Sequence, residues 1–260
     1  MIVLVLGSIL LGKTATLFLC LLAGILCLDE ILINFVQLKR KDNNYRAIVL
    51  LFFIFFLIVN FFTDAKDARL LFTLMAIFLN SFLFYYLFKI PLTSAFMRKS
   101  SEKYPGLLSV VAVLPFMSLG ILFESDSWRI VLAILLLVTF SMDTAAWFFG
   151  KNFGKNKLWP EVSPKKTKEG FWGGVATSAL VGAIAWLSFF KELRWYYVLV
   201  FAFCAAISQA GDLVQSKIKR EFGIKDSSSL IPGHGGVYDR IDSLIFLSPF
   251  FGLVIKLLGT

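Results

Sequence analysis

The chain has 260 residues, of which 58% are hydrophobic, and a mean hydropathy of +0.79. These values argue against a soluble protein, because apolar runs of roughly 17–25 residues, long enough to cross a ~30 Å hydrocarbon layer, recur along the chain. A net charge of +9 would point to nucleic acid in a soluble protein, but in a membrane protein it reflects the excess of Lys and Arg in cytoplasmic loops. We therefore predict an all-α polytopic membrane protein with no nucleic-acid partner, because backbone groups inside lipid must be satisfied within helices.

Apolar segments divide the chain into nine predicted spans. The first is too short to cross a bilayer unaided and carries neither a basic leader nor a cleavage site, so we interpret it as a retained short span and not as a signal peptide. Spans one to four and a linker form an N-terminal region, 1–106. Spans five to nine form a catalytic region, 107–260, which holds the loops 150–170 and 216–240. The spans cover residues 1–12, 14–36, 46–62, 67–89, 107–123, 128–149, 171–190, 194–218 and 240–258.

Basic residues alternate between the two sides of these spans. Four connections, 37–47, 89–106, 150–170 and 216–240, hold 19 of the 26 Lys and Arg residues, and the remaining seven lie in the other connections and at the C-terminal end. Loops rich in Lys and Arg stay in the cytoplasm. The sequence thus predicts an integral protein of a bacterial-type cell membrane, with a cytoplasmic N-terminus, four basic cytoplasmic loops and an external C-terminus.

The first polar cluster is FSMDTAAWFFG, which places Asp143 inside a predicted span. Its carboxylate lies about 9 Å from the end of that span at ~1.5 Å per residue, and burying it costs on the order of 2.5–3.5 kcal/mol. A protonated Asp, or one reaching the membrane surface, would need no function, but Asp is too short to reach far. We interpret Asp143 as a site residue.

The second cluster is GKNFGKNKLWPEVSPKKTKEGFWGG. Glycine lets backbone approach a phosphate and lysine supplies positive charge, so Ser163, Lys165 and Lys166 are candidate substrate-binding residues. Thr167 and Glu169, just ahead of an apolar helix, are also typical of an N-cap. The ordinary bias of lysine toward cytoplasmic loops remains the alternative explanation for the lysines.

The third cluster begins with SQAGDLVQSKIKREFG at the end of the eighth span. On a helix of 3.6 residues per turn, Asp212, Ser216 and Lys219 share one face, with Arg220 at its edge. That face carries an acid, a hydroxyl and a base in order from membrane depth to the surface.

The chain then continues into KDSSSLIPGHGGVYDRID, which holds its only histidine, His234. We expect Gly235 and Gly236 to give close backbone approach or a positive φ beside a phosphate. Asp239 and Asp242 lie three residues apart and share one face of the helix that follows. Acidic residues also suit a helix start, which would explain one of the two.

The residue types in these clusters suit the transfer of a phosphate-bearing group. Carboxylate oxygens are ligands that Mg²⁺ prefers. The chain has one His and no Cys at ligand spacing, which argues against a zinc site. Lys and Arg would neutralise a polyphosphate in phosphoryl or nucleotidyl transfer, and no Walker A motif is present. Because every cluster lies at the membrane boundary, we expect one lipid substrate and one soluble nucleotide. The candidate metal ligands are Asp143, Asp212, Asp239 and Asp242, and the candidate polyphosphate contacts are Lys165, Lys166, Lys219, Arg220, Lys225 and Arg240.

One long pattern crosses the last cluster. It reads Ser216-x-Ile218-Lys219-Arg220, four residues, Lys225-Asp226-x-Ser228-x-x-Ile231-Pro232-x-His234-Gly235-Gly236-Val237-x-Asp239-Arg240-Ile241-Asp242. It resembles the full signature of phosphatidate cytidylyltransferases, also called CDP-diacylglycerol synthases. The upstream DTAAW and SPKKTKEGFWGG segments are similar to another region of that family, so the resemblance covers 140–245. Over 1–130 it rests on hydropathy and the number of spans, and Gln215 stands where many members have an acidic residue.

The resemblance implies that CTP and phosphatidate react to give CDP-diacylglycerol and diphosphate, a step of phospholipid biosynthesis. It also implies Mg²⁺ dependence, with the number of metal ions left open, a polar cavity that opens to the cytoplasm and the membrane, and a homodimer. The acidic residues of the signature would hold the metal, which here means Asp212 and Asp239, with Asp143 as a partner.

Lys219 and Arg220 would then help to neutralise the leaving diphosphate. A phosphate monoester is already largely ionised at pH 7, with a second pKa of about 6, so the reaction needs no strong base. We therefore expect His234 to donate a hydrogen bond to phosphate or protein rather than to act as an obligate base.

Two other functions fit parts of the pattern. A CTP-dependent lipid kinase of the polyprenol or phytol type would share the membrane setting but transfer the γ-phosphate to an alcohol. An ion-coupled transporter would need polar residues across the whole membrane depth, whereas the charged residues here gather on one side.

Overall fold

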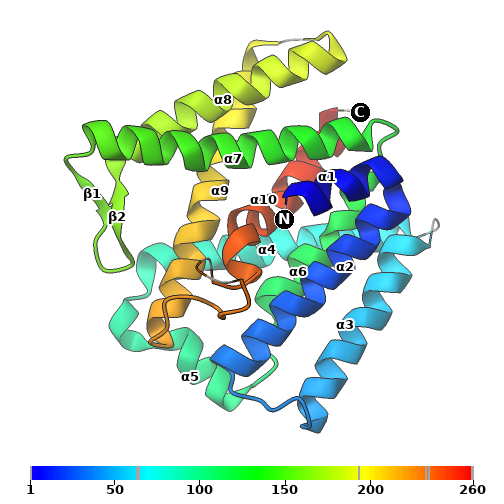
Figure 1. Cartoon of the computed structure of the whole chain (residues 1–260), viewed down its shortest axis with the longest axis vertical. Helices are drawn as coiled ribbons and strands as arrows, with labels where there is room; N and C mark the ends of the chain where they lie inside the picture. The colour runs from blue at the N-terminus through cyan, green and yellow to red at the C-terminus, as the bar shows by residue number, and fades with distance from the viewer. Residues whose placement is uncertain (1, 63–64, 193, 232, 234, 259–260) are drawn as a thin grey trace.

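The computed structural model describes residues 2–62, 65–192, 194–231, 233 and 235–258 (Figure 1). Helices make up most of it. The elements are α1 (Ile2–Leu11), α2 (Lys13–Glu30), the π-helical turn η1 (Ile31–Phe35), α3 (Asn43–Phe61), α4 (Lys66–Lys89), η2 (Leu92–Ser94), α5 (Phe96–Lys103), α6 (Val110–Ser118), η3 (Leu119–Phe123), α7 (Trp128–Phe153), β1 (Lys157–Trp159), β2 (Ser163–Thr167), α8 (Lys168–Phe190), α9 (Trp195–Glu221) and α10 (Tyr238–Leu258).

Among the described residues, seven helices are long and apolar enough to cross a membrane: α2 with η1, α3, α4, α7, α8, α9 and α10. This confirms the prediction of a helical polytopic membrane protein. The other two predicted spans, 1–12 and 107–123, correspond to α1 and to α6 with η3, which are shorter. The helix tightens into a 3-10 turn soon after Pro115, which has no N–H to donate to a preceding carbonyl.

The loop predicted between the sixth and seventh spans contains a β-hairpin that the sequence analysis did not predict. β1 and β2 pair antiparallel, with Lys157 opposite Thr167 and Trp159 opposite Ser163. Thr167 caps α8 as expected, since its Oγ1 accepts the Gly170 amide at 3.1 Å. The hairpin therefore lies directly over the start of α8.

Charged side chains tie the connections together at one end of the helices. Glu124, between η3 and α7, pairs with Arg69 of α4 at 2.8 Å and with Lys256 of α10 at 3.0 Å. Lys13 donates to the Phe123 carbonyl at 2.7 Å. These contacts group the connections that the charge count placed on the side poor in Lys and Arg.

The opposite end joins two of the predicted basic loops, 89–106 and 216–240, to each other and to the end of the second predicted span. Asn34, in η1, donates to the Ser227 carbonyl in the loop after α9 at 2.8 Å. Glu221, at the end of α9, accepts the Met97 amide at the start of α5 at 2.8 Å. Less basic connections thus contact one another at one end of the helices, and basic loops contact one another at the other end.

Helix α9 organises the site. It is the most buried of the seven candidate spans, since 61% of its most apolar 18-residue stretch lies inside the molecule. It packs against α4, α7, α8 and α10, and in Figure 1 it runs from the α7–α8 pair down towards α5. Polar side chains on α9 can therefore meet residues from several other helices.

The ion pairs of Glu124 give a pH-dependent stability. Burial alone would raise the pKa of its carboxyl, but Arg69 and Lys256 outweigh burial, so the pKa lies below its usual range. A carboxyl whose pKa is lowered in the folded state stabilises the fold at any pH above its unfolded-state pKa, which is about 4.3 for Glu. This stabilisation is lost as the pH falls through the folded-state pKa.

We predict that Glu124→Gln lowers the free energy of unfolding by about 1–3 kcal/mol at pH 7, and that the difference shrinks below about pH 4. Thermal unfolding of both proteins in detergent, from pH 7 to below pH 4, measures this difference in stability. The control is Glu102→Gln, which removes the exposed pair of Glu102 with Arg98 and should cost less than about 1 kcal/mol. Equal losses for both variants at pH 7 would contradict the role of Glu124.

Candidate active site

The predicted face of α9 is present and reaches two other elements. Asp212 accepts the Ser216 hydroxyl at 3.2 Å and forms an ion pair with Lys166 of β2. Lys219, further along the same helix, donates to Oδ1 of Asp239 in the first turn of α10 at 2.7 Å. The acid, hydroxyl and base expected from the spacing therefore lie together, joined to the hairpin on one side and to α10 on the other.

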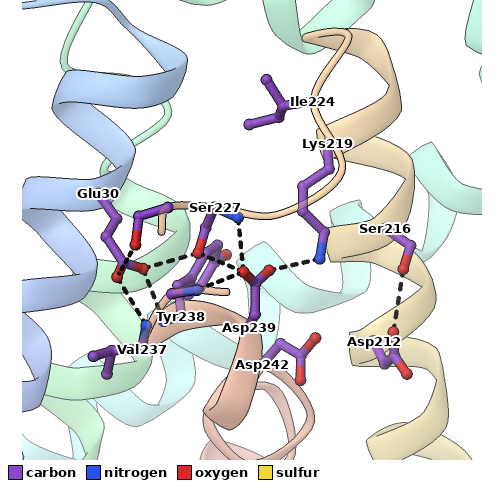
Figure 2. A network of polar contacts seen from close by, with 12 residues as sticks. Glu30, Asp212, Ser216, Lys219, Ile224, Ser227, Val237, Tyr238, Asp239 and Asp242 are labelled. Carbon is purple, nitrogen blue, oxygen red and sulfur yellow. Dashed lines mark hydrogen bonds and ion pairs between the residues drawn. The ribbon is translucent and has the colours of Figure 1, made fainter. Parts of the chain in front are cut away.

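Asp239 is held by the loop that precedes its own helix. Its Oδ2 accepts the Ser227 amide at 2.7 Å, the Ser227 hydroxyl at 2.9 Å and the Gly236 amide at 2.9 Å (Figure 2). The side chains of Lys219 and Asp239 are 11% and 6% exposed. A charge buried this deeply has to be compensated, and the lysine and three hydrogen bonds compensate it.

The glycine turn lies close to a carboxylate of the protein itself. Gly235 has φ +80°, and a Cβ added there would lie 2.6 Å from Oδ2 of Asp239. A Cβ on Gly236 would collide with the Ser227 hydroxyl and the Glu30 carboxylate. The backbone of the turn thus wraps the Asp239 carboxylate, and its role beside a phosphate stays a prediction. His234 lies outside the described residues.

Two cavities meet at Asp143 and Asp212, which line both. The first, about 430 Å³, is bounded by α7, α8, α9 and the hairpin, and Lys151, Lys165 and Lys166 line it. The second, about 810 Å³, is lined by charged side chains and by apolar side chains from α1, α7 and α10. The charged residues of the second cavity are Asp143, Asp212, Lys219, Asp226, Asp239, Arg240 and Asp242.

The carboxylates differ in how far the protein satisfies them. Asp143 is exposed to the cavities and, within the described part of the chain, makes no hydrogen bond or ion pair. Asp242 accepts only from its neighbour Ser243 among those residues, and it lies within electrostatic range of Asp212. These free oxygens have the chemistry that Mg²⁺ prefers. Among residues 2–62, 65–192, 194–231, 233 and 235–258, however, no three His, Cys, Asp or Glu side chains already stand at metal-binding distances.

Other predicted site residues lie apart from both cavities. Arg220 donates from its guanidinium to the Ile224 carbonyl at 3.2 Å and closes the turn after α9. Lys225 is exposed on the following loop. Ser163 lies at the start of β2, opposite Trp159.

Glu30 is a site residue that the sequence analysis missed. It ends α2, is 3% exposed, and accepts four hydrogen bonds from the loop and the start of α10 (Figure 2). The signal that could have found it is the one that found Asp143, an acidic residue inside a predicted span.

Lys217 was also misjudged, because it was counted among the loop cations. It is 2% exposed, and its ammonium donates to the Tyr86, Leu87 and Ile90 carbonyls at the end of α4. Carbonyls in the last turn of a helix lack some of their usual partners, although the Tyr86 carbonyl also accepts the Ile90 amide at 3.4 Å, and a cation also suits a helix C-terminus. Lys217 thus fixes α4 against α9.

Carboxylates paired with lysines at one end of the long apolar helices form the polar site of this protein. Residues 1–258 match the sequence model of the cytidylyltransferase family, and the chain belongs to that family.

Several relatives are phosphatidate cytidylyltransferases. That of Staphylococcus epidermidis is 42% identical over 135 residues, which is 51% of this chain and 51% of the relative. Those of Bacillus subtilis and Staphylococcus aureus are 43% identical over 122 residues and 40% identical over 146, covering 46% and 54% of this chain and 45% and 55% of the relatives. The alignments thus span about half the length of these curated relatives.

The glycine turn gives a prediction with a built-in control. Gly223 also has a positive φ, +70°, but a Cβ there would meet nothing within 4 Å. Gly223→Ala should therefore lower the free energy of unfolding by the cost of the conformation alone, about 1–2 kcal/mol. Gly235→Ala should lose about 1–3 kcal/mol more, because its Cβ crowds Asp239. Equal losses, measured by thermal unfolding in detergent, would show that the turn does not enclose Asp239.

Proposed function

We propose that the chain transfers the cytidylyl group of CTP to phosphatidate, giving CDP-diacylglycerol and diphosphate. The observation that carries the proposal is the pair of cavities that share Asp143 and Asp212. A lysine-lined cavity suits a soluble triphosphate, and a cavity lined by both charged and apolar side chains suits a lipid with a charged headgroup. Family membership and the names of the relatives support the same reaction.

The residues present account for binding and charge neutralisation. Lys151, Lys165 and Lys166 would hold the triphosphate, with Lys166 already oriented by Asp212. An oxygen of the phosphatidate phosphate would attack the α-phosphorus of CTP. The bond from that phosphorus to the oxygen bridging the α- and β-phosphates would break, and diphosphate would leave with the electron pair. The incoming phosphate is already ionised, so the cations and not a base do most of the work.

We propose Mg²⁺ as the cofactor, held by Asp143, Asp212, Asp239 and Asp242, of which Asp239 would have to exchange its contact with Lys219 for the ion. When bound, it would neutralise negative charge on the phosphates. The free carboxylate oxygens of Asp143 and Asp242 support this assignment.

The proposed topology has nine passes, with α1 and α6–η3 as the two short ones. The N-terminus and the site face the cytoplasm and the C-terminus lies outside. The grouping of the less basic connections at one end supports this arrangement, as does the cytoplasmic location of CTP. A homodimer is proposed on the family resemblance alone.

Product analysis tests the reaction. Purified protein in detergent is incubated with phosphatidate, Mg²⁺ and CTP labelled at either the α- or the γ-phosphate. We predict that label from the α-phosphate enters the lipid and label from the γ-phosphate is released as diphosphate. Lipid labelled from the γ-phosphate, with CDP released, would instead identify a CTP-dependent lipid kinase and reject the proposal.

A further inference from the structure

The Glu30 carboxylate is surrounded by hydrogen-bond donors from the far end of the chain. Its Oε1 accepts the Ser228 hydroxyl at 2.8 Å and the Val237 amide at 2.8 Å. Its Oε2 accepts the Ser227 hydroxyl at 2.9 Å and the Tyr238 amide at 3.0 Å. Each carboxylate oxygen thus has two donors within hydrogen-bond distance, and these donors lie about 200 positions further along the sequence.

These four donors come from both ends of one loop. Ser227 and Ser228 follow α9, whereas Val237 and Tyr238 mark the start of α10, where the first amides of a helix lack partners within it. A negative charge at that position also suits the helix dipole. Glu30 therefore closes the loop and caps α10 from outside, as Figure 2 shows.

The Ser227 hydroxyl links Glu30 to Asp239. It lies 2.9 Å from Oε2 of Glu30 and 2.9 Å from Oδ2 of Asp239, but it has one proton to donate. Glu30 and Asp239 thus compete for that proton, while the amides of Ser227 and Gly236 stay on Oδ2. With Oδ2 occupied by the loop, Oδ1 is the oxygen that meets Lys219.

We propose that Glu30 is a positioning residue for cytidylyl transfer, a role that rests on the proposed function. It holds the loop so that Oδ1 of Asp239 and the ammonium of Lys219 keep a fixed direction at the wall of the second cavity. All four hydrogen bonds of Glu30 go to the loop and α10, so it acts through them and not on a substrate. A displacement of about 1 Å in such groups can slow a reaction about 100-fold.

Glu30→Gln is the test, because it keeps the volume but points an amide NH₂ at two groups that are themselves donors. We expect kcat to fall about 100-fold while KM for CTP stays within about threefold, since the hairpin lysines are not touched. Amide hydrogen exchange at residues 226–228 and 236–239 should become faster. This second readout needs no activity.

The matched control is Glu221→Gln. Glu221 is likewise buried and caps a helix, through the Met97 amide and the Tyr86 hydroxyl, but these contacts lie at α5 and α4. We expect a similar loss of thermal midpoint, kcat within about threefold of the wild type, and unchanged exchange at 226–239.

Three results would overturn the inference: a Glu30→Gln enzyme with near-normal kcat, unchanged exchange in the loop, or kcat losses in both variants that simply follow their thermal midpoints. If Glu30→Gln does not fold, Ser228→Ala removes one donor, and its kcat should fall about 5- to 10-fold. A normal kcat for Ser228→Ala would also overturn it. A wild type that forms no CDP-diacylglycerol would reject the proposed function, while the exchange measurement would still decide whether Glu30 clamps the loop.

Discussion

The ion pairs Lys166–Asp212 and Lys219–Asp239 hold the site together around α9. A carboxylate inside a membrane protein is costly, and a buried pair is stable only when further hydrogen bonds satisfy its remaining oxygens. This requirement explains why β2 packs over α9 and why a loop rich in Ser and Gly lies beside Asp239. The same requirement explains why the buried Glu30 carboxylate is surrounded by hydrogen-bond donors from that loop and from the start of α10.

The contrast between satisfied and unsatisfied carboxylates indicates where a ligand would bind. Asp239 and Glu30 have their oxygens occupied by the protein, whereas Asp143 and Asp242 keep oxygens free towards the second cavity. The first cavity, which Asp143 and Asp212 also line, is lined by Lys151, Lys165 and Lys166. A triphosphate and a lipid phosphate entering from these two cavities would meet at Asp143 and Asp212, which is the arrangement that the proposed transfer requires.

The parts of this structure that the sequence predicted are those set by neighbouring residues. Hydropathy located the long helices, and helical spacing placed Asp212 beside Ser216. Contacts between distant segments could not be predicted: spacing alone does not show that Lys219 reaches Asp239 or that Glu30 closes the loop. Lys217 was misjudged for the same reason, because the carbonyls that bury its charge belong to another helix.

If the lysine-lined cavity receives the triphosphate, then Lys166→Met should change the KM for CTP. Lys166 lines the cavity, whereas Lys168, two residues on, is exposed at the start of α8 and serves as the control. Loss of a charged hydrogen bond to phosphate should raise KM for CTP about 10- to 100-fold in Lys166→Met. Lys168→Met should leave it within about twofold. An unchanged KM in Lys166→Met, or an equal rise in both variants, would show that the triphosphate does not bind in this cavity.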